Sequence, residues 1–438
     1  MERRLVTLTK SRWIGQAVVA ATLTLLAIMY ARAAFTPPVD FSTYYGAALN
    51  VRAGRNLYDD ALAWKAAGYA TGSPRQQPTK QIAYVYPPTL ALALLPLTAL
   101  PLQAASAIWL AILFACVAAT AWCVATLITR RDSNSWLLVA ALTLAFTFFK
   151  PVRGALMFSK EVDPLIMLLL AAMLFFFIRR RDGWTAVLLG FAIAIKPFLV
   201  LLASLLLWKR AYRAVIGTGI LSAGLVIGPL LAFGLVGDFV EATSYWAGTA
   251  QASSPVSQSA YSFLLRSLTV QPYTVPLLNA PWLVTPLRAL IGVTLVGGLV
   301  ATISRSRNEP AIIQLLEFGL VVAAMLIFGP LTEECHLAYL TIGLTATAAA
   351  AISVWHASAS ARRITVATAT LVLFFLLPRT QIIAWGLFRH GAGPLAPPLS
   401  FVTSLFLYAV LATAVLNLAA LRLLRRDAST NQPPVLPV

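Results

Sequence analysis

The stretch LQAASAIWLAILFACVAATAWCVATLI, residues 102–128, contains no charged side chain. Its length exceeds the roughly 20 residues that a helix needs to cross a hydrocarbon core of about 30 Å. Similar apolar stretches recur from Trp13 to Leu424, and none alternates between apolar and polar residues as a transmembrane strand would. The sequence therefore predicts an all-α integral membrane protein.

The amino-acid composition also indicates that this chain lies in a lipid membrane. Of its 438 residues, 59% are hydrophobic and only 11% are charged, against roughly 25% charged residues in soluble domains. The formal net charge is +18, but the basic residues form short runs between apolar segments, as topology signals do. We therefore expect membrane lipids as partners and no nucleic acid.

The cysteines and the N-terminus add two constraints. Cys116, Cys123 and Cys335 form no disulfide framework, and the first two share one apolar segment, where they would serve in packing. The first apolar stretch, from Trp13 to Ala34, is too long for a typical signal-peptide core and has no clear cleavage site. We expect it to remain as the first helix.

The other candidate spans are 102–128, 136–150, 163–179, a proline-broken pair in 184–208, 212–235, 284–303, 310–328, 338–355, 363–379 and 400–423. Pro87, Pro88, Pro96 and Pro101 leave room for only a short helix in 85–100. If that stretch does not cross, and 184–208 turns back at Lys196-Pro197, then the basic runs at 130–131, 179–181, 209–210 and 425–426 are all cytoplasmic.

This interpretation gives about 12 crossings with both termini inside. In the rival interpretation 85–100 crosses and 184–208 runs straight through, which leaves five arginines outside. The positive-inside rule favours the first. We expect one membrane domain over 1–424 and a disordered cytoplasmic tail over 425–438, which is polar and rich in proline.

Both interpretations place four loops outside: 35–83, 236–283, 329–337 and 380–399. In the first loop, Phe41–Ala53 and Leu57–Ala70 carry apolar residues at helical spacing among polar ones. This pattern predicts amphipathic juxtamembrane helices. Whatever chemistry the protein performs is expected in these loops.

Asp40 follows the first apolar stretch, in Pro37-Pro38-Val39-Asp40-Phe41. A carboxylate beside apolar walls has a raised pKa and can act as a base at neutral pH. Aspartate is also a favoured N-cap residue, so Asp40 could instead cap a helix that begins near Phe41. Position alone leaves both interpretations open.

The stretch DFSTYYGAALNVRAGRNLYD, residues 40–59, resembles the signature of glycosyltransferase family 87, the polyprenol-phosphate-mannose-dependent mannosyltransferases with a GT-C fold. Four later segments resemble the family in the same order: YPP at 86–88, GFAIAIKP at 190–197, SQSAYSFLLR at 257–266 and GPLTEECHLAY at 329–339. The resemblance implies a GT-C-type bundle of helices, with juxtamembrane helices in the first outer loop.

Two segments depart from the family pattern. Where the family usually has Gly-Gln-Val-Asn, this chain has SKEVD at residues 159–163, so charged groups replace a neutral polar contact. The sugar or the acceptor could therefore differ. In the late motif Cys335 stands where the first of two paired histidines is expected, and only His336 remains. A role that requires two histidines does not transfer to this chain.

The resemblance implies a role for Asp40. It would take the proton from the acceptor hydroxyl while that oxygen attacks the anomeric carbon and polyprenyl phosphate leaves. The sugar phosphate is already activated, so the protein must supply a base, alignment and charge stabilisation, and no cofactor is needed. A single displacement implies inversion at the anomeric carbon.

Three cations are candidates for binding the donor phosphate. Lys196 precedes a proline in an apolar segment, where a lysine is costly enough to suggest a function; it could also snorkel or pair with a carboxylate. Arg266 lies in an outer loop and has a forked guanidinium suited to phosphate, unless it is an ordinary surface arginine. Lys160 is outside only in the preferred topology.

The residues expected to position the acceptor or the sugar lie in three outer segments: Tyr44, Tyr45, Gln258, Ser259, Glu333 and His336. For the two tyrosines, an interfacial aromatic belt is the alternative explanation. Residues 333–336 read Glu-Glu-Cys-His and contain metal-ligating side chains. We nevertheless expect no metal, because adjacent residues rarely point at one ion and no partner motif is visible.

Together these patterns predict an inverting transferase in the bacterial cytoplasmic membrane, with its active site facing outside. It would move a hexose, mannose by resemblance, from a polyprenyl phosphate to a lipid or glycan acceptor. The main rival is a transporter or flippase of lipid-linked sugars, since broken helices and intramembrane lysines also occur in transporters. The long first outer loop and the lack of an obvious internal repeat favour the enzyme.

Overall fold

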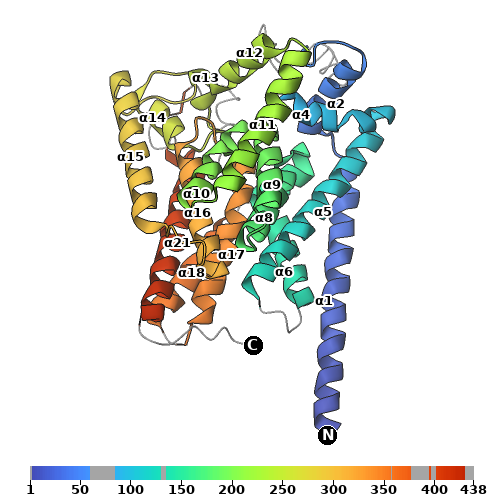
Figure 1. The fold of residues 1–438 in the computed structure, drawn as a ribbon, viewed down its shortest axis with the longest axis vertical. Coiled ribbons are helices and arrows are strands. Elements are labelled where there is room, and N and C mark those ends of the chain that lie inside the picture. Colours follow the sequence, from blue (N-terminus) through green and yellow to red (C-terminus); the bar gives the residue numbers. More distant parts are fainter. Residues whose placement is uncertain are drawn as a thin grey trace.

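The computed structural model describes residues 2–59, 84–129, 135–356, 358–375, 394–395 and 401–429. Over these residues the protein is helical, apart from an isolated parallel bridge between Thr274 and Leu395. Most long helices run roughly along one axis (Figure 1). Helix α1 (Glu2–Ala34) follows one edge of the bundle and α15 (Val284–Thr302) follows the other.

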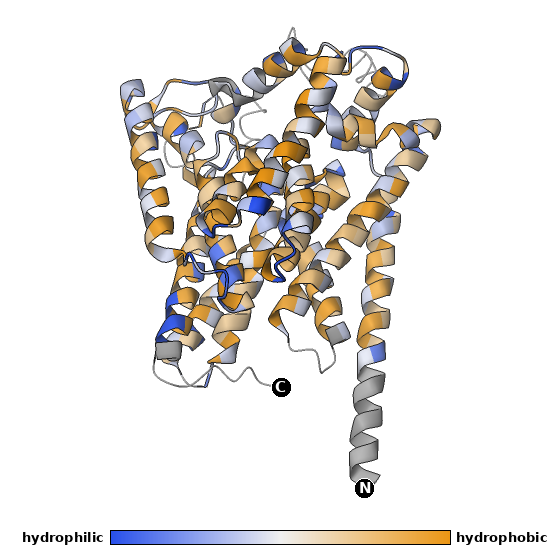
Figure 2. Cartoon of the chain, in the orientation of Figure 1, coloured by the Kyte–Doolittle hydropathy of each residue, from blue (hydrophilic) through white to orange (hydrophobic). Residues whose placement is uncertain are grey.

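Seven helices of the described residues are long and apolar enough to span a membrane, and hydrophobic residues predominate along the bundle (Figure 2). They lie at 15–34, 102–128, 212–232, 281–302, 311–328, 334–353 and 405–426. Helix α6 (Ser135–Phe148) continues after a 69° bend into Lys150–Ser159 and could provide an eighth span. The protein is thus an all-helical membrane protein, as predicted.

The predicted count of about 12 spans is not reached within the described residues. Helices α8 (Asp163–Ile178) and α9 (Asp182–Ile195) have only 16 and 14 residues, fewer than the roughly 17 that a span requires. Both helices occur where apolar stretches predicted them. The apolar pattern therefore located the helices correctly, but it did not show which of them are long enough to cross.

A central group of three helices is packed through small residues. Helices α16 (Ala311–Phe328), α17 (Leu340–Ser353) and α21 (Leu405–Ser429) contact one another. A Cβ atom placed on Gly319 would lie 2.9 Å from the Cα atom of Gly343 and about as close to the amide of Asn417. Without side chains the two backbones approach closely, which is how membrane helices gain packing contacts.

The broken segment after α9 turns back, as the preferred topology expects. Pro197 disfavours helical geometry at Lys196, whose backbone is extended (φ −125°, ψ 94°). The chain then returns through η3 (Pro197–Leu202) and α10 (Ala203–Trp208). Both ends of the pair contact the same connection: Asp182 pairs with Arg307, and Lys209 Nζ lies 3.0 Å from Ser304 O.

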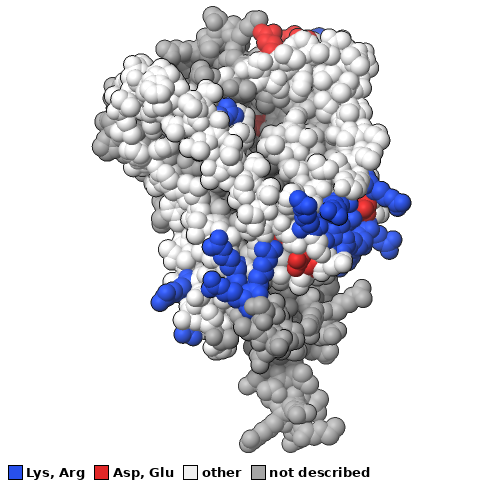
Figure 3. All heavy atoms as spheres, turned by 60° about the vertical axis from the view of Figure 1, so that its left-hand side comes forward, with Lys and Arg blue, Asp and Glu red and all other residues white. Residues whose placement is uncertain are grey.

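Basic residues gather at the end of the bundle where this pair begins and ends (Figure 3). Buried Glu317 of α16 forms ion pairs with Lys209 at 2.6 Å and with Arg425 at 2.9 Å, and Arg180 donates a hydrogen bond to Asn308. The preferred topology expects the runs at 179–181, 209–210 and 425–426 on one side, and they do lie at one end. Arg130 and Arg131 lie outside the described residues.

In residues 35–83, which we expect to form the first outer loop, α2 (Val39–Arg52) forms where a helix was expected. It is buried along much of its length against α4 (Pro88–Ala93) and η1 (Leu95–Ala99), rather than buried on one face only. These two short helices confirm that the prolines of 85–100 permit no long one. Residues 60–70 of the expected second juxtamembrane helix lie outside the described residues.

Residues 236–283, which we expect to form the second outer loop, contain α12 (Val236–Ala247), α13 (Thr249–Ala252) and α14 (Ala260–Leu268). At the C-terminus, α18 (Ala359–Phe374) packs against α17 and α21. Helix α21 continues to Ser429, so the disordered tail expected from residue 425 was placed too early. Residues 430–438 lie outside the described residues.

Candidate functional site

Four carboxyl groups and one ammonium from separate segments meet in the interior. We call this the carboxylate cluster; it comprises Asp40, Glu161, Asp163, Lys196 and Glu333. The ammonium of Lys196 lies 2.6 Å from Asp163 Oδ2 and 3.7 Å from Glu161 Oε1. Glu333 and Asp163 are close enough to Asp40 for their charges to raise its pKa. Burying ionisable groups costs free energy unless they pair, and Lys196 pairs with two of the four carboxyl groups.

A tight reversal before α8 brings two of these carboxyl groups together. After α7 (Lys150–Gly154) and η2 (Ala155–Ser159), Lys160 adopts a left-handed backbone (φ 51°, ψ 46°). The N–H of Glu161 then donates to Ala155 O at 3.0 Å, and α8 begins at Asp163. Glu161 and Asp163 therefore both face Lys196, which the break before Pro197 places opposite them.

Lys160 itself is directed to other partners. Its ammonium donates to Thr36 O at 3.0 Å and to Ser106 Oγ at 2.7 Å, while Trp109 donates to its carbonyl oxygen. The side chain is fully buried and forms no ion pair with the described residues. Lys160 thus fixes the left-handed turn to α5 (Leu102–Ile128), and this geometry gives no support to the phosphate contact expected of it.

Tyrosine side chains surround the pair formed by Lys196 and Asp163. The hydroxyl of Tyr339, in η5 (Glu334–Tyr339), donates to Asp163 Oδ1. Lys196 Nζ lies 5.8 Å from the centroid of the Tyr86 ring, and the hydroxyls of Tyr86 and Tyr44 are 3.1 Å apart. Tyr44 therefore lies beside the cluster, whereas the hydroxyl of Tyr45 donates to Leu100 O.

Asp40 occupies the first turn of α2, half-buried at the edge of the cluster. The helix begins at Val39 after Pro38, and no side chain caps it, so the capping interpretation of Asp40 is wrong. Its carboxyl group accepts a hydrogen bond from Ser159. Burial and then the charge of Glu333 raise the pKa of Asp40 to about 7. At neutral pH this carboxyl can therefore both lose and accept a proton.

The segment before α17 folds onto the cluster. The N–H of Glu333 donates to His336 Nδ1 at 3.1 Å, and the His336 ring packs against Phe198 with 5.0 Å between centroids. Cys335 Sγ lies 3.9 Å from Glu333 Oε2. Burial raises the pKa of Glu333. The acid, the thiol and the imidazole all lie near Glu161, and this group could hold a metal ion.

Arg266, Gln258 and Ser259 form a separate hydrogen-bonded unit in the second outer loop. Buried Arg266 donates to Ser254 O, Ser257 O and Ser404 Oγ at 2.8–3.0 Å. Gln258 joins this loop to Thr403 O and to Phe406 N, and Ser259 caps α14. These hydrogen bonds hold residues 254–266 in place. Arg266 is no surface arginine, but both of its Nη atoms are already bonded.

The unit nevertheless borders the segment that carries Glu333. The N–H of Gln258 donates to Thr332 O at 2.6 Å, and Thr332 N donates to Ser257 Oγ at 3.3 Å. Gln258 and Ser257 thus join the second loop to the segment that carries Glu333.

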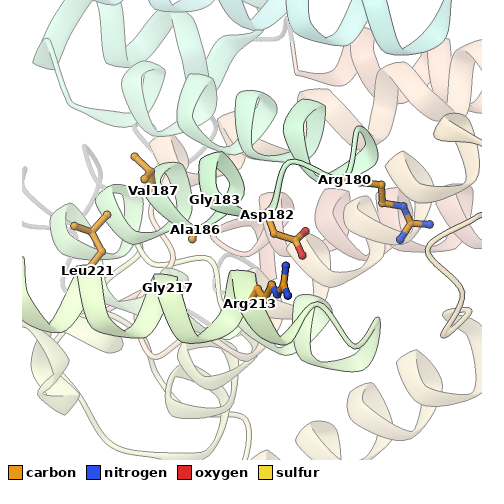
Figure 4. A pocket seen from close by; sticks show the side chains of 8 residues that line it. All are labelled: Arg180, Asp182, Gly183, Ala186, Val187, Arg213, Gly217 and Leu221. Atoms are coloured by element: carbon orange, nitrogen blue, oxygen red, sulfur yellow. The ribbon is translucent and has the colours of Figure 1, made fainter.

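A hollow of about 550 Å³ opens between α9 and α11 (Tyr212–Ala232), where Arg180, Asp182 and Arg213 line it (Figure 4). It lies at the basic end of α9, whereas Lys196 follows the other end of the same helix. The hollow contains no member of the carboxylate cluster. We therefore assign it no part in the chemistry of the cluster.

The residues that sequence inference did not assign to the site are Tyr86, Ser159, Glu161, Asp163 and Tyr339. A signal existed for two of them, because Glu161 and Asp163 are carboxyl groups beside an apolar helix and fall in a departure from the family pattern. Ser159 and Tyr339 stand at the ends of the segments SKEVD and GPLTEECHLAY, but nothing in either segment indicates a role for them. Only the packing of η5 and η2 against α8 reveals them.

Residues 84–330, more than half of the chain, match the model of glycosyltransferase family 87. The protein therefore belongs to glycosyltransferase family 87. The matched stretch contains Glu161, Asp163 and Lys196, while Asp40 and Glu333 lie on either side of it.

Among solved structures, ArnT from Cupriavidus metallidurans bound to undecaprenyl phosphate is similar, with 14% identity and a TM-score of 0.41. The alignment covers 98% of this chain and 82% of ArnT. No curated protein matches the sequence.

Proposed function

We propose that this protein is an inverting hexosyltransferase that uses a polyprenyl-phosphate sugar, mannose by resemblance to its family, and a lipid or glycan acceptor. The observation that carries the proposal is the placement of Asp40, a half-buried carboxyl group with a pKa of about 7 at the edge of a polar cluster. Such a group can remove the acceptor proton as the new glycosidic bond forms. Family membership supports the reaction class.

In the proposed mechanism the acceptor hydroxyl donates its proton to Asp40, and its oxygen attacks the anomeric carbon from the side opposite the phosphate. The bond from that carbon to the phosphate oxygen breaks, and polyprenyl phosphate leaves with the electron pair. Lys196 stabilises the developing charge on the phosphate. Asp163 holds the ammonium of Lys196 in place at 2.6 Å. The ammonium has three N–H donors, so two of them remain for other partners.

Tyr44 and Tyr86, whose hydroxyls are 3.1 Å apart, contribute the wall beside the sugar. His336 and Glu333 position the acceptor from the opposite segment. Arg266 and Gln258 keep the second outer loop in place and are not part of the phosphate contact in this proposal.

The active site is proposed to face the outside of the bacterial cytoplasmic membrane. Basic side chains gather at the end of the bundle where Asp182 and Lys209 meet the 303–308 connection. The positive-inside rule favours a cytoplasmic position for that end. Lys196 follows the opposite end of α9 and would therefore approach the outer face.

The test compares the parent with Asp40→Asn in a membrane assay that supplies polyprenyl-phosphate mannose, another polyprenyl-phosphate hexose or a nucleotide sugar. An amide keeps the size of the side chain but cannot accept a proton at neutral pH. We expect transfer from the polyprenyl-phosphate donor to fall by a factor of about a hundred or more, with donor binding retained. Near-parental transfer by the folded variant would sink the mechanism.

A transporter of lipid-linked sugars remains the alternative, because the segment broken at Lys196 is also typical of transporters. The same assay separates the two functions. A transporter changes the side on which the donor is found and forms no glycoside, so the appearance of a glycosylated product decides for the transferase.

A further inference from the structure

The two departures from the family pattern meet in space. Glu161, from the SKEVD segment, lies beside Glu333, Cys335 and His336 from the late motif. One ligating atom from each of these four residues lies within 4.8 Å of each of the others. The sequence showed no second group of ligands beside residues 333–336. The structure supplies one in Glu161, from the acidic turn before α8.

The four side chains form a suitable set of ligands for a borderline divalent metal. Two carboxylates, a thiolate and an imidazole are the donor types that Zn²⁺ accepts, and the thiolate disfavours Mg²⁺ or Ca²⁺. Tetrahedral zinc at its usual bond lengths separates its ligand atoms by roughly 3.4–3.8 Å. The group must contract by about 1 Å, which side-chain rotations of two glutamates can provide.

Two hydrogen bonds must be exchanged when the ion binds. Cys335 Sγ, 3.9 Å from Glu333 Oε2, has to lose its proton to the solvent and coordinate as thiolate. His336 Nδ1 accepts the N–H of Glu333 at 3.1 Å. This contact has to break whichever ring nitrogen coordinates, because a bound imidazole carries its proton on the other nitrogen.

The surroundings favour an additional positive charge. Asp40, Glu161, Asp163 and Glu333 surround a single ammonium, that of Lys196. An anionic substrate would meet repulsion from such a group, and a divalent cation would offset it. We propose that Glu161, Glu333, Cys335 and His336 form a zinc-class metal site beside the carboxylate cluster. This site can bind metal whether or not the proposed transfer reaction is correct.

The experiment uses the full-length protein in lipid nanodiscs and does not depend on activity. The protein is stripped with a chelator and titrated with Co²⁺, and absorption is recorded for the visible bands of tetrahedral cobalt and the thiolate-to-cobalt charge-transfer band. Zinc content is measured in parallel by mass spectrometry. We expect one equivalent of either metal and a thiolate band in the parent protein.

Three variants make the result specific. Cys335→Ser should lose the charge-transfer band and bind at least tenfold more weakly, and Glu161→Gln should also weaken binding. Cys335→His should retain metal but lose the thiolate band, which shows that a lost band is not a folding defect. The matched control is Cys116→Ser, a buried cysteine of α5 outside the group, which should behave as the parent.

Less than a fifth of an equivalent in the parent, or equal binding by Cys335→Ser and Cys116→Ser, would overturn the site. Stoichiometric metal with loss of the band only in the Cys335 variants would establish it. Failure of sugar transfer in a protein that still binds metal would count against the proposed function alone.

Discussion

Lys196 and Asp163 are 33 positions apart in the chain, and their charged atoms are 2.6 Å apart in the interior. Lys196 directly follows α9 and has an extended backbone before Pro197, while Asp163 is the first residue of α8. The pair therefore joins a helix break to a helix start. The alternative that Lys196 pairs with a carboxylate, which the sequence left open, is confirmed.

Removing the ammonium should leave Asp163 buried without its counter-charge. Breaking one side of a buried pair costs about 3–5 kcal/mol, so we expect Lys196→Met to lower the thermal unfolding midpoint strongly and to abolish transfer. The double variant Lys196→Met with Asp163→Asn should recover much of the stability but no activity. Arg213→Met, an exposed cation at the hollow of α9 and α11, is the control. Equal midpoints for the single and double variants would contradict the pairing.

The rate of transfer should rise as the pH increases through about 7, because Asp40 has a pKa of about 7 and must be ionised to act as the base. The rising limb should be absent from the residual activity of Asp40→Asn. The measurement is the pH dependence of transfer at saturating donor. A parental profile that is flat between pH 5.5 and pH 8.5, or a limb retained in the variant, would exclude Asp40 as the titrating group.

The raised pKa of Asp40 should also make the free energy of unfolding depend on pH. The pKa of Asp40 is raised in the folded protein from 3.8 to about 7, so the folded state holds more protons than the unfolded state in that window. Asp40 therefore costs stability as the pH rises from 4 to 7, and the cost is constant above. Asp40→Asn should match the parent near pH 4 and exceed it in unfolding midpoint above pH 7. The reverse order at high pH would contradict the raised pKa.

Arg266 should matter for folding more than for donor binding. Its guanidinium makes two hydrogen bonds within the second outer loop, to Ser254 O and Ser257 O, and one to Ser404 Oγ. Arg266→Gln removes bonds to a buried charged group, each worth about 1.5–3 kcal/mol, and should lower the unfolding midpoint with little change in donor KM for the folded fraction. A large rise in donor KM with unchanged stability would instead restore the phosphate contact predicted from the sequence.

The contact between Gly319 and Gly343 should tolerate no side chain. In Gly343→Ala the new methyl group would lie 2.9 Å from the Cα atom of Gly319, and overpacking of this kind costs about 1–3 kcal/mol. Gly297→Ala in α15 has open space around it and should be neutral or slightly stabilising. Thermal unfolding of both variants in the same detergent checks the difference. Equal midpoints would show that α16 and α17 are not held at this distance.

Topology can be tested with an impermeant thiol reagent in intact cells, on a background without native cysteines. Asn56→Cys in the first outer loop should react from outside, and Arg180→Cys should react only after the membrane is permeabilised. Both side chains are exposed. Labelling of residue 180 in intact cells would reverse the proposed orientation of the carboxylate cluster.

The local hydropathy pattern was sufficient to locate most of the helices. Apolar runs located α5, α8, α11 and α16 to within a few residues, because a helix in lipid must satisfy its own backbone and so needs a continuous apolar stretch. Pro197 marked the reversal at Lys196 for an equally local reason, its lack of an N–H group. The number of spans was overestimated, because an apolar run does not show whether its helix crosses or stops short.

The sequence by itself determined the lipid environment, the helix positions and the candidates Asp40 and Lys196, since hydropathy and the effect of proline act over neighbouring residues. Only the tertiary structure decided which polar residues share a site. It joined Glu161 and Asp163 to Lys196 and Glu333, and it directed Lys160 and Arg266 to other partners. These contacts depend on how helices far apart in the chain pack against one another, and a lone lysine in an apolar segment has the same local pattern whether it faces a phosphate or a serine.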